Sequence, residues 1–308
     1  MTGVICLSLQ TMQPAPIPTA CVLCLGNFDG VHIAHRALLN TAKNLRAHRF
    51  PDAVCGVFCF DPPSSDFFGT GEPAHLASLS EKLSYFRDEG AEYAFLADFS
   101  ALRDMSAEQF ATEILKDYCH CVAAVCGFNF RFGHKGAGEP SLLKSLLGIP
   151  VEVKAEIQAD GKTVSSSRIR TLLRNGRPEE AAALLNRPYS IRSEVLHGKA
   201  LGRKWGFPTI NQAFPEGMLI PRHGVYITDC TLPDGSHRRG ISNVGIHPTV
   251  DQNATINCET HLLDFDGDLY GDEITVSFLH FIRPEMKFET QKALQEQIER
   301  DLESAKKY

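Results

Sequence analysis

Two histidines stand three residues apart in a glycine-flanked turn, in the stretch GNFDGVHIAH from Gly26 to His35, called here the histidine turn. The glycines allow a tight turn, and His32 and His35, at positions i and i+3, share one face at the start of a helix. A helix N-terminus offers unpaired N–H groups and positive potential to an anion. The turn is therefore suited to holding a nucleotide triphosphate and to stabilising the charge that develops during attack on its α-phosphate.

Two alternatives stay open for the histidine turn. One or both histidines could merely cap or cover the helix, and the two residues alone do not separate that role from phosphate binding. Metal ligation by histidines at i and i+3 ranks well below phosphate binding, because no nearby cluster of carboxylates and histidines completes a metal site.

A second candidate anion site is VSSSRIR, from Val164 to Arg170. Serines that open a helix supply hydroxyl and N–H groups to phosphate, and Arg168 and Arg170 add charge-assisted donors. The alternative is a serine-rich helix cap with solvated arginines. A third stretch, CGFNFRFGHKGAG at 126–138, joins aromatic residues to closely spaced glycines and so suits a flat aromatic ligand. Its alternative is a packed loop whose phenylalanines are core.

The second half carries a glycine-rich and basic loop, HGKALGRKWGFPTIN at 197–211. Such a loop can fold its amides over phosphates, although glycine spacing without a Walker A motif is a weak signal. Thr209 and Asn211, two apart on an extended segment, point the same way and offer oxygens to a hard cation such as Mg²⁺. The alternative is a polar strand edge. The phosphate-binding candidates of the loop are Gly198, Lys199 and Gly202.

The first half of the chain alternates apolar strands with amphipathic helices. Strands are expected at 20–25, 53–60, 92–99 and 121–127, and helices at 34–45, 78–89 and 106–118. This alternation predicts a mainly parallel α/β sheet in three layers, with ligands beyond the carboxyl ends of the strands. The histidine turn would lie at such an end.

The texture changes after two short helices at 165–188. Short strands separated by glycine and proline turns are expected at 189–196, 224–232, 238–245, 259–265 and 273–281, with DFDGDLYG as a turn cluster. They indicate a compact β-barrel or sandwich closed by a helix from about Thr290 to Lys307. The boundary between the two domains is expected near 186–189.

Composition bounds the class of protein. The chain has 308 residues, 43% of them hydrophobic and 22% charged, which predicts packed cores and room for two domains. A net charge of -6 and a pI near 6.1 argue against nucleic acid as a partner. No apolar run approaches the roughly 20 residues of a membrane span, and the start MTGVICLSLQ lacks the basic flank of a secretory signal, so we expect no membrane partner and a cytoplasmic protein.

The ten cysteines support that location, because most stand singly in apolar strands and are typical of reduced, buried thiols. Cys21 and Cys24 form a C-x-x-C pair. A three-residue offset on a strand sends their side chains to opposite faces, which makes a zinc or redox role improbable.

These stretches together, in their order and spacing, resemble the prokaryotic bifunctional riboflavin kinase/FMN adenylyltransferases, also called FAD synthetases. The resemblance implies an N-terminal nucleotidylyltransferase domain with a Rossmann-like parallel sheet at 1–186, which transfers AMP from ATP to FMN. It implies a mainly β riboflavin kinase barrel with a terminal helix at 187–308. The implied ligands are riboflavin, FMN, FAD, ATP, ADP and pyrophosphate, with Mg²⁺ or another divalent cation accompanying ATP. Oligomeric state stays open.

The resemblance also assigns roles to residues. His32 and His35 fill the family's H-x-G-H positions, FPTIN resembles the PTAN signature of riboflavin kinases, and Glu259 becomes the catalytic base that accepts the proton of a ribityl hydroxyl. The remaining assignments are Gly26, Asn27, Phe28, Ser166, Ser167, Arg168 and Arg170 to ATP and its phosphates, and Phe60, Phe128, Asn129, Phe132, Arg283 and Glu285 to the flavin.

Three departures from the family pattern bear on the first domain. Ala34 replaces the glycine of H-x-G-H, Asn129 replaces an aspartate, and the loop DPPSSDFF lacks a histidine between its prolines. One alternative is therefore a riboflavin kinase with an impaired adenylyltransferase domain. Another is a non-catalytic flavin sensor. A different adenylyl- or cytidylyltransferase is a distant third, because it leaves the β half unexplained.

Overall fold

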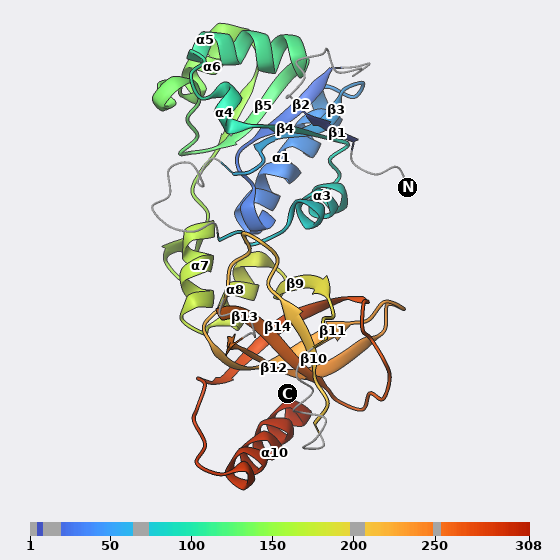
Figure 1. Ribbon diagram of the computed structural model, residues 1–308. Helices are drawn as coiled ribbons and strands as arrows, with labels where there is room; N and C mark the ends of the chain where they lie inside the picture. Colours follow the sequence, from blue (N-terminus) through green and yellow to red (C-terminus); the bar gives the residue numbers. More distant parts are fainter. Residues whose placement is uncertain (1–4, 9–19, 64–73, 198–206, 249–253) are drawn as a thin grey trace. The chain divides into compact units, whose positions relative to one another are not determined.

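The computed structural model describes residues 5–8, 20–63, 74–197, 207–248 and 254–308 (Figure 1). The chain forms two compact units. The first comprises Met1–Pro73 and Ala77–Ser166, and the second comprises Ala74–Leu76 and Ser167–Tyr308.

The first unit is built on a parallel sheet of six strands in the order β1-β4-β3-β2-β5-β6. All residues of the central strand β2 are buried, as expected where a parallel sheet is covered on both faces. The strands are β1 (Ile5–Ser8), β2 (Cys21–Leu25), β3 (Val54–Phe60), β4 (Tyr93–Ala97), β5 (Cys121–Gly127) and β6 (Val151–Lys154). The parallel α/β sheet is confirmed; the two edge strands β1 and β6 were not predicted.

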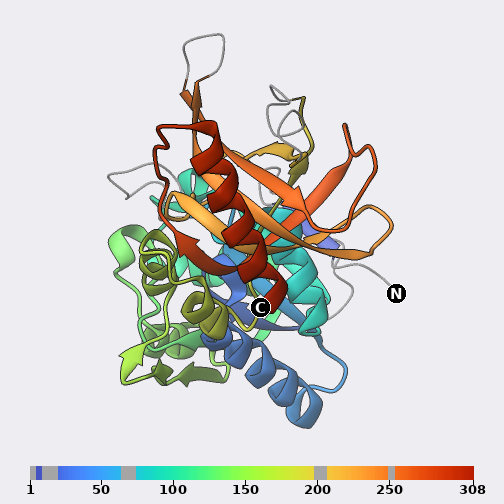
Figure 2. The ribbon, with the colours of Figure 1, turned by 90° about the horizontal axis from the view of Figure 1, so that it is seen from below.

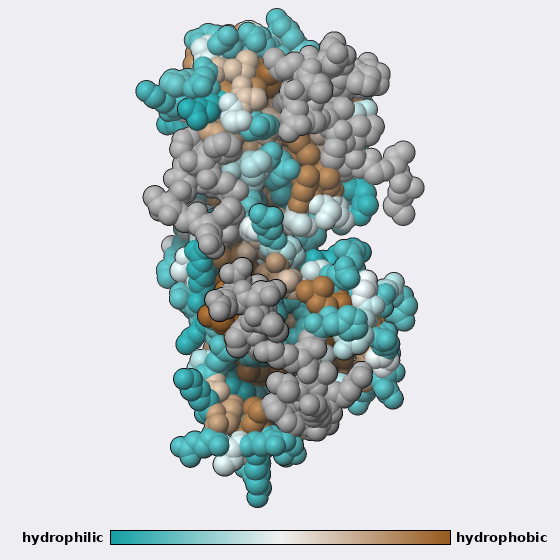
Figure 3. Space-filling model, viewed as in Figure 1, coloured by the Kyte–Doolittle hydropathy of each residue, from teal (hydrophilic) through white to brown (hydrophobic). Residues whose placement is uncertain are grey.

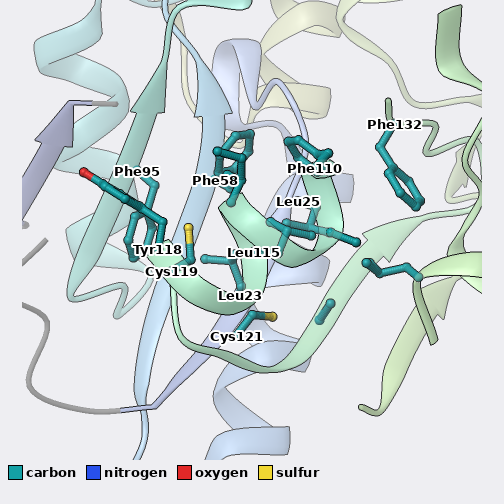
Figure 4. Close-up of a cluster of buried hydrophobic side chains, with 14 of the residues drawn as sticks. Leu23, Leu25, Phe58, Phe95, Phe110, Leu115, Tyr118, Cys119, Cys121 and Phe132 are labelled. Atoms are coloured by element: carbon teal, nitrogen blue, oxygen red, sulfur yellow. The ribbon is translucent and has the colours of Figure 1, made fainter. Parts of the chain in front are cut away.

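Helices cover both faces of this sheet. One face packs against α1 (Ile33–Arg49) and α3 (Leu79–Asp88). The other packs against η3 (Phe110–Tyr118) and α6 (Pro140–Leu147), and its buried cluster is drawn in Figure 4. Cys21 belongs to the second cluster and Cys24 to the first, which confirms that the C-x-x-C pair points to opposite faces.

Local side chains set the helix boundaries in this unit. Ser78 with Glu81 caps α3, and a capping box of Ser106 with Gln109 opens α5 (Ala107–Gln109), which continues into η3. The strand expected at 92–99 ends at Ala97, because the Asp98 carboxylate accepts the Ser100 N–H at 2.8 Å and caps α4 (Phe99–Leu102). The unit also contains η2 (Asp29–Val31), η4 (His134–Gly136) and the short hairpin strands β7 (Gln158–Ala159) and β8 (Lys162–Thr163).

The second unit is built on an antiparallel sheet of six strands in the order β10-β13-β12-β11-β14-β9. The Leu196 N–H donates to the Asn211 carbonyl at 2.8 Å and joins the two ends of that order, so the sheet closes into a barrel. The strands are β9 (Tyr189–Glu194), β10 (Ile210–Ala213), β11 (Gly224–Thr231), β12 (His237–Pro248), β13 (Ala254–Leu262) and β14 (Glu273–Arg283).

Strand β13 differs from its prediction at both ends. It begins before the expected 259–265 segment and ends at Leu262, and Asp264 then takes a left-handed conformation with φ of 53°. A left-handed residue turns the chain away from the extended path, which explains why the strand stops there.

Three helices belong to the second unit. α7 (Ser166–Arg174), all but its first residue, and α8 (Pro178–Leu185) pack with the barrel, and the Arg222 N–H donates to the Leu173 carbonyl at 3.0 Å. The predicted helix at the end of the chain is α10 (Gln291–Lys307), which packs against β12 and lies across the strands in Figure 2. The domain division expected after residue 186 follows α8 and stays a prediction.

The visible face in Figure 3 is mainly hydrophilic, with hydrophobic residues in small groups. Among the described residues, no helix combines the length and the apolar character that a membrane span requires.

Candidate active sites

The histidine turn follows the carboxyl end of β2, in the middle of the parallel sheet. Phe28 and Gly30 both take positive φ, 52° and 74°, which folds the chain through η2 into the first turn of α1. His32 then serves as the N-cap of α1, because its Nδ1 accepts the N–H of His35 at 3.4 Å. The helix-capping alternative is therefore confirmed for one nitrogen of His32, and capping with Nδ1 is compatible with phosphate binding by the rest of the ring.

The two imidazoles stack on each other. Their centroids lie 3.7 Å apart with planes at 13°, and the ring centroid of Phe28 lies 5.0 Å from that of His35. His32 is 4% exposed, and Nδ1 of His35 is buried without a hydrogen-bond partner among the described residues. Burial, then the neighbouring His32 and Lys82, hold the pKa of His35 well below its ordinary value. His35 is therefore neutral at physiological pH and offers a hydrogen bond to an anion without a full charge.

The serine segment reaches the histidine turn through one hydrogen bond. The hydroxyl of Ser166 donates to the carbonyl of Asp29 at 2.9 Å, which joins two stretches 137 residues apart. Ser167 is exposed and Arg168 is half-buried. Within the second unit, Nε of Arg170 donates to the carbonyl of Ala74 at 2.7 Å. Of the expected phosphate ligands in this segment, Ser166 is thus joined directly to the histidine turn.

Three neighbouring strands bring further predicted residues to the same edge of the sheet. β2 lies between β3 and β5, and all three run parallel. Gly26 and Asn27 follow β2, Phe60 ends β3, and Phe128 and Asn129 follow β5. Ligands of open α/β sheets bind beyond these carboxyl ends. Asn27 and Asn129 are exposed, and Phe128 is 53% exposed.

Two phenylalanines of the predicted site have buried rings, and their ligand roles stay predictions. Phe132 is 6% exposed and packs beside Phe110 and Phe130, so the packed-loop alternative holds for its ring. Phe28 is fully buried and meets Phe86 edge to face at 5.5 Å, so its ring is part of the core. Phe60 is half-buried between Phe58 and Phe99 and keeps part of its ring accessible.

In the second unit, a polar row crosses the outer face of the barrel. Asn211 of β10 lies directly opposite Glu259 of β13, and Glu259 lies opposite Asn243 of β12. Directly opposed residues of antiparallel strands share one face of the sheet. The amide of Asn243 donates to the carboxylate of Glu285 at 3.3 Å. The structure therefore places a predicted metal ligand and the predicted base in one row with Asn243, and Asn243 links the row to a predicted flavin ligand. Sequence reasoning missed Asn243.

Arg283 is held by the terminal helix. Its Nη2 lies 2.7 Å from Oδ2 of Asp301, with side chains 15% and 4% exposed, and Gln297 donates to the other carboxylate oxygen at 2.8 Å. The charge of this predicted flavin ligand is thus compensated within the protein. An isolated acid on an amphipathic helix gave no sequence signal for this partnership.

A cavity of about 250 Å³ opens beside Thr209. Its wall includes Thr260, Asp266 and Tyr270, so the segment DFDGDLYG, interpreted from sequence as a turn cluster, lines a potential ligand site. His197 stacks on Tyr270 with ring centroids 4.0 Å apart. The predicted phosphate ligands Gly198, Lys199 and Gly202 follow directly in the chain and lie outside the described residues, as does most of the DPPSSDFF loop.

The donor chemistry suits a cation that arrives with a nucleotide. Within the described ranges, no group of three or more His, Cys, Asp and Glu side chains could hold a metal by itself. Thr209 and Asn211 offer neutral oxygens and Glu259 a carboxylate, which are the hard ligands that Mg²⁺ takes together with phosphate oxygens and water.

The nine cysteines from Cys21 to Cys258 are free and buried. Burial raises the pKa of Cys126 to about 11 and, more strongly, that of Cys121 to about 12. These thiols stay protonated at neutral pH and are poor nucleophiles and metal ligands.

Both halves of the chain match models of known families. Residues 15–168 match FAD synthetase and residues 185–308 match riboflavin kinase. A solved structure titled "Crystal Structure of Macrolide-efflux Protein from Streptococcus pneumoniae" is 28% identical and superposes with a TM-score of 0.89, covering 99% of this chain and 100% of its own.

Similar curated proteins are bifunctional riboflavin kinase/FMN adenylyltransferases. The protein of Pseudomonas fluorescens is 35% identical over 297 residues and that of Haemophilus influenzae 32% over 292 residues, with 94% of each chain covered in both comparisons. The Escherichia coli K12 protein is 33% identical over 305 residues, 97% of this chain and 96% of its own. The chain therefore belongs to the bifunctional riboflavin kinase/FMN adenylyltransferases, transferases that phosphorylate riboflavin to FMN and adenylylate FMN to FAD.

Proposed function

We propose that the two activities occupy two separate sites: FMN adenylylation at the histidine turn, and riboflavin phosphorylation at the Asn211–Glu259–Asn243 row. The observation that carries this assignment is the row itself. It sets a neutral oxygen ligand, a carboxylate and an amide donor side by side on the riboflavin kinase half of the chain.

At the histidine turn, catalysis depends on positioning and charge stabilisation. An oxygen of the FMN phosphate attacks the α-phosphorus of ATP, and pyrophosphate leaves. His32 and His35 donate hydrogen bonds to the phosphates, and the backbone of Gly26 to Phe28 lies at the same strand end. Donors fixed before the reaction stabilise developing charge without reorganising. Asn27, Ser166, Ser167, Arg168 and Arg170 complete the proposed ATP ligands, and Phe60, Phe128 and Asn129 the flavin ligands.

At the barrel row, Glu259 accepts the proton of the ribityl hydroxyl while that oxygen attacks the γ-phosphorus of ATP. Thr209 and Asn211 would hold Mg²⁺, which would neutralise phosphate charge when bound with ATP. Asn243 fixes Glu285 beside the same row. Gly198, Lys199 and Gly202 remain proposed phosphate ligands, and Arg283 and Glu285 proposed flavin ligands.

The departures from the family pattern leave the proposed donors in place. Ala34 is the second residue of α1 and is half-buried. Its methyl group takes the place of a glycine hydrogen, so the change removes no polar group from the site. Asn129 keeps an oxygen at its position and loses a charge. We therefore assign adenylylation to this unit, and we propose that Ala34 and Asn129 change the rate of adenylylation and do not abolish it.

We further propose that the functional division of the chain follows residue 186 and that the protein works in the cytoplasm. The gap between the matched segments, 15–168 and 185–308, supports a division in this region. Free buried cysteines support a reducing compartment.

A time course of products tests the assignment. Pure protein is incubated with riboflavin, ATP and Mg²⁺, and riboflavin, FMN and FAD are separated by chromatography, alongside His32→Ala and Glu259→Ala. We expect FMN to rise before FAD, the first variant to stop at FMN, and the second to convert supplied FMN but not riboflavin.

Other outcomes overturn specific parts of the assignment. FMN without FAD from the unmodified protein indicates an impaired first site. Binding of riboflavin, measured by fluorescence, without any product indicates a flavin sensor. Full riboflavin kinase activity in Glu259→Ala would show that this carboxylate is not the catalytic base.

A further inference from the structure

Lys82 is a buried lysine on the inner face of α3. It is 2% exposed, and its Nζ has no hydrogen-bond partner in the described part of the chain. Lysine is almost never fully buried unless it is paired, because removing an ammonium from water destabilises the fold. A packing role would be filled better by an apolar residue, so the charge itself calls for an explanation.

Lys82 lies on the face of α3 that packs against the histidine turn. Lys82 and Phe86, one turn apart, are the buried residues of α3, and Phe86 contacts Phe28 edge to face. One turn further, Glu89 pairs with Arg36 of α1 at 2.5 Å. α3 also packs against η2, and Figure 1 shows α1 and α3 on the same side of the sheet.

The charge of Lys82 acts on the histidine pair. It is one of the groups that lower the pKa of His35, after burial and His32. The buried Asp29 of the same turn is not a hydrogen-bond partner of this ammonium. Lys82 therefore places a buried amino group, without a hydrogen-bond partner in the described part of the chain, close enough to the neutral imidazole of His35 to act on it.

We propose that Lys82 is a phosphate-binding residue of adenylyl transfer, whose ammonium binds the β- and γ-phosphates of ATP and stabilises the departing pyrophosphate. The proposal rests on the assignment of FMN adenylylation to the histidine turn. The phosphates of ATP would then give the Lys82 ammonium hydrogen-bond partners and an opposite charge.

The proposed step balances without proton transfer from Lys82. An oxygen of the FMN phosphate forms a bond to the α-phosphorus of ATP. The bond from that phosphorus to the oxygen bridging to the β-phosphate breaks, and pyrophosphate leaves with the electron pair. Negative charge grows on the bridging oxygen, and a fixed cation in a site of low dielectric constant stabilises it more in the transition state than in bound ATP.

Lys82→Met separates this role from a structural one. Methionine keeps an unbranched apolar chain and removes the charge, and replacing a buried charge by an apolar side chain is often neutral or stabilising when the charge has no structural partner. We expect a thermal midpoint at or above that of the unmodified protein, together with a kcat/KM for FMN adenylylation lowered about 100-fold or more. Riboflavin kinase activity, measured in the same sample, reports that the second unit is unchanged.

The experiment compares Lys82→Met with Lys116→Met, which removes an exposed lysine from η3 of the same unit. For each protein, adenylylation is measured with varied ATP, inhibition with varied pyrophosphate, and the thermal midpoint with and without pyrophosphate. We expect Lys82→Met to weaken pyrophosphate inhibition about 10-fold and to reduce pyrophosphate stabilisation, with Lys116→Met unchanged. Added methylamine should restore part of the rate of Lys82→Ala.

Each contrary outcome overturns a defined statement. Adenylylation and pyrophosphate inhibition unchanged in Lys82→Met remove Lys82 from the phosphate site. A lowered thermal midpoint with loss of activity, and no rescue of Lys82→Ala by methylamine, make it a structural residue. His32→Ala is assayed in parallel: if it stays active as well, the site assignment itself fails, and if it alone loses activity, only the role of Lys82 fails.

Discussion

The two candidate sites are built in different ways. At the histidine turn, the defining contact joins His32 and His35, three residues apart in the chain. In the barrel, the defining contacts join residues on different strands, such as Asn243 and Glu285, 42 residues apart. A local site depends on helix and turn geometry, whereas a cross-strand site depends on the register of several strands at once. Substitutions that leave strand register unchanged should therefore affect the two sites independently.

The sites also differ in how they treat a buried cation. Arg283 of the barrel unit forms an ion pair with Asp301, and the Gln297 amide donates a hydrogen bond to the other oxygen of that carboxylate. The charge of Arg283 is therefore compensated within the protein. Lys82 beside the histidine turn has no such partner among the described residues. A paired cation stabilises the fold, and an unpaired one is available to a ligand.

Removing the partner of the paired cation should have the largest effect. Asp301→Ala leaves the guanidinium of Arg283 buried and unpaired, so we expect the barrel unit to lose about 3–5 kcal/mol of stability. Urea unfolding followed by near-UV circular dichroism measures this loss. The matched control is Glu273→Ala, which breaks the exposed pair with Arg192, 60% exposed on both sides, and should change stability by less than about 1 kcal/mol. Equal losses in the two variants would show that burial of the pair contributes nothing.

His32→Asn tests whether the first site needs an imidazole or only a cap. Asparagine is a good N-cap, so α1 should keep its start while the ring is lost. We expect adenylylation to fall about 100- to 1,000-fold, as for removal of a donor to developing charge, with riboflavin phosphorylation unchanged. His32→Ala should show the same loss of rate and in addition lose about 0.5–2 kcal/mol of stability, since the cap is gone. Full adenylylation activity in His32→Asn would show that His32 acts only as the N-cap of α1.

Gly245→Ala tests the cross-strand site without replacing any of its polar residues. A Cβ at Gly245 would lie 2.1 Å from the carboxylate of Glu285, so that flexible side chain must move and give up the hydrogen bond from Asn243. We expect the kcat/KM of riboflavin phosphorylation to fall about 10-fold, the equivalent of one hydrogen bond to a charged group, with adenylylation unchanged. Asn243→Ala should have a similar effect, and the double variant should lose little more. Additive losses would show that the two changes act separately.

The pH dependence of stability should reveal the neutral histidine. The pKa of His35 is lowered in the folded protein, so below its ordinary value of 6.5 the unfolded chain binds more protons than the folded one, and stability falls as pH falls. The slope contributed by one such group is at most about 1.4 kcal/mol per pH unit. Urea unfolding at pH 7.5, 6.5 and 5.5 should show this slope in the unmodified protein and a smaller slope in His35→Gln. An unchanged slope in the variant would assign the effect to other groups.

Much of the fold could be predicted from local patterns. The strands Cys21–Leu25 and Val54–Phe60, the cap of α3 at Ser78 and the final helix follow from residue periodicity and capping chemistry. Edge strands were missed because short segments such as Val151–Lys154 carry no clear periodicity of their own and form by pairing with a neighbour.

The candidate site residues show the same difference between properties that follow from local sequence and properties that depend on packing. Exposed Phe128 and buried Phe132, four positions apart in one loop, have the same chemistry in the sequence, and only packing separates a ring available to a ligand from a core ring. Asn243, Asp301 and Lys82 were missed because each looks like an ordinary polar residue on a strand or an amphipathic helix. Their burial and partners come from distant segments.

The sequence by itself determined the order of elements, the parallel α/β and β-barrel halves, and the local chemistry of the histidine turn, because these depend on neighbours within one or two helical turns or on strand alternation. The tertiary structure alone decided which carboxylate faces Asn211, which buried cation is paired, and which has no hydrogen-bond partner among the residues that the structure describes. Those properties depend on strand register and on packing between distant segments, where a shift of one residue along a strand moves a side chain to the opposite face.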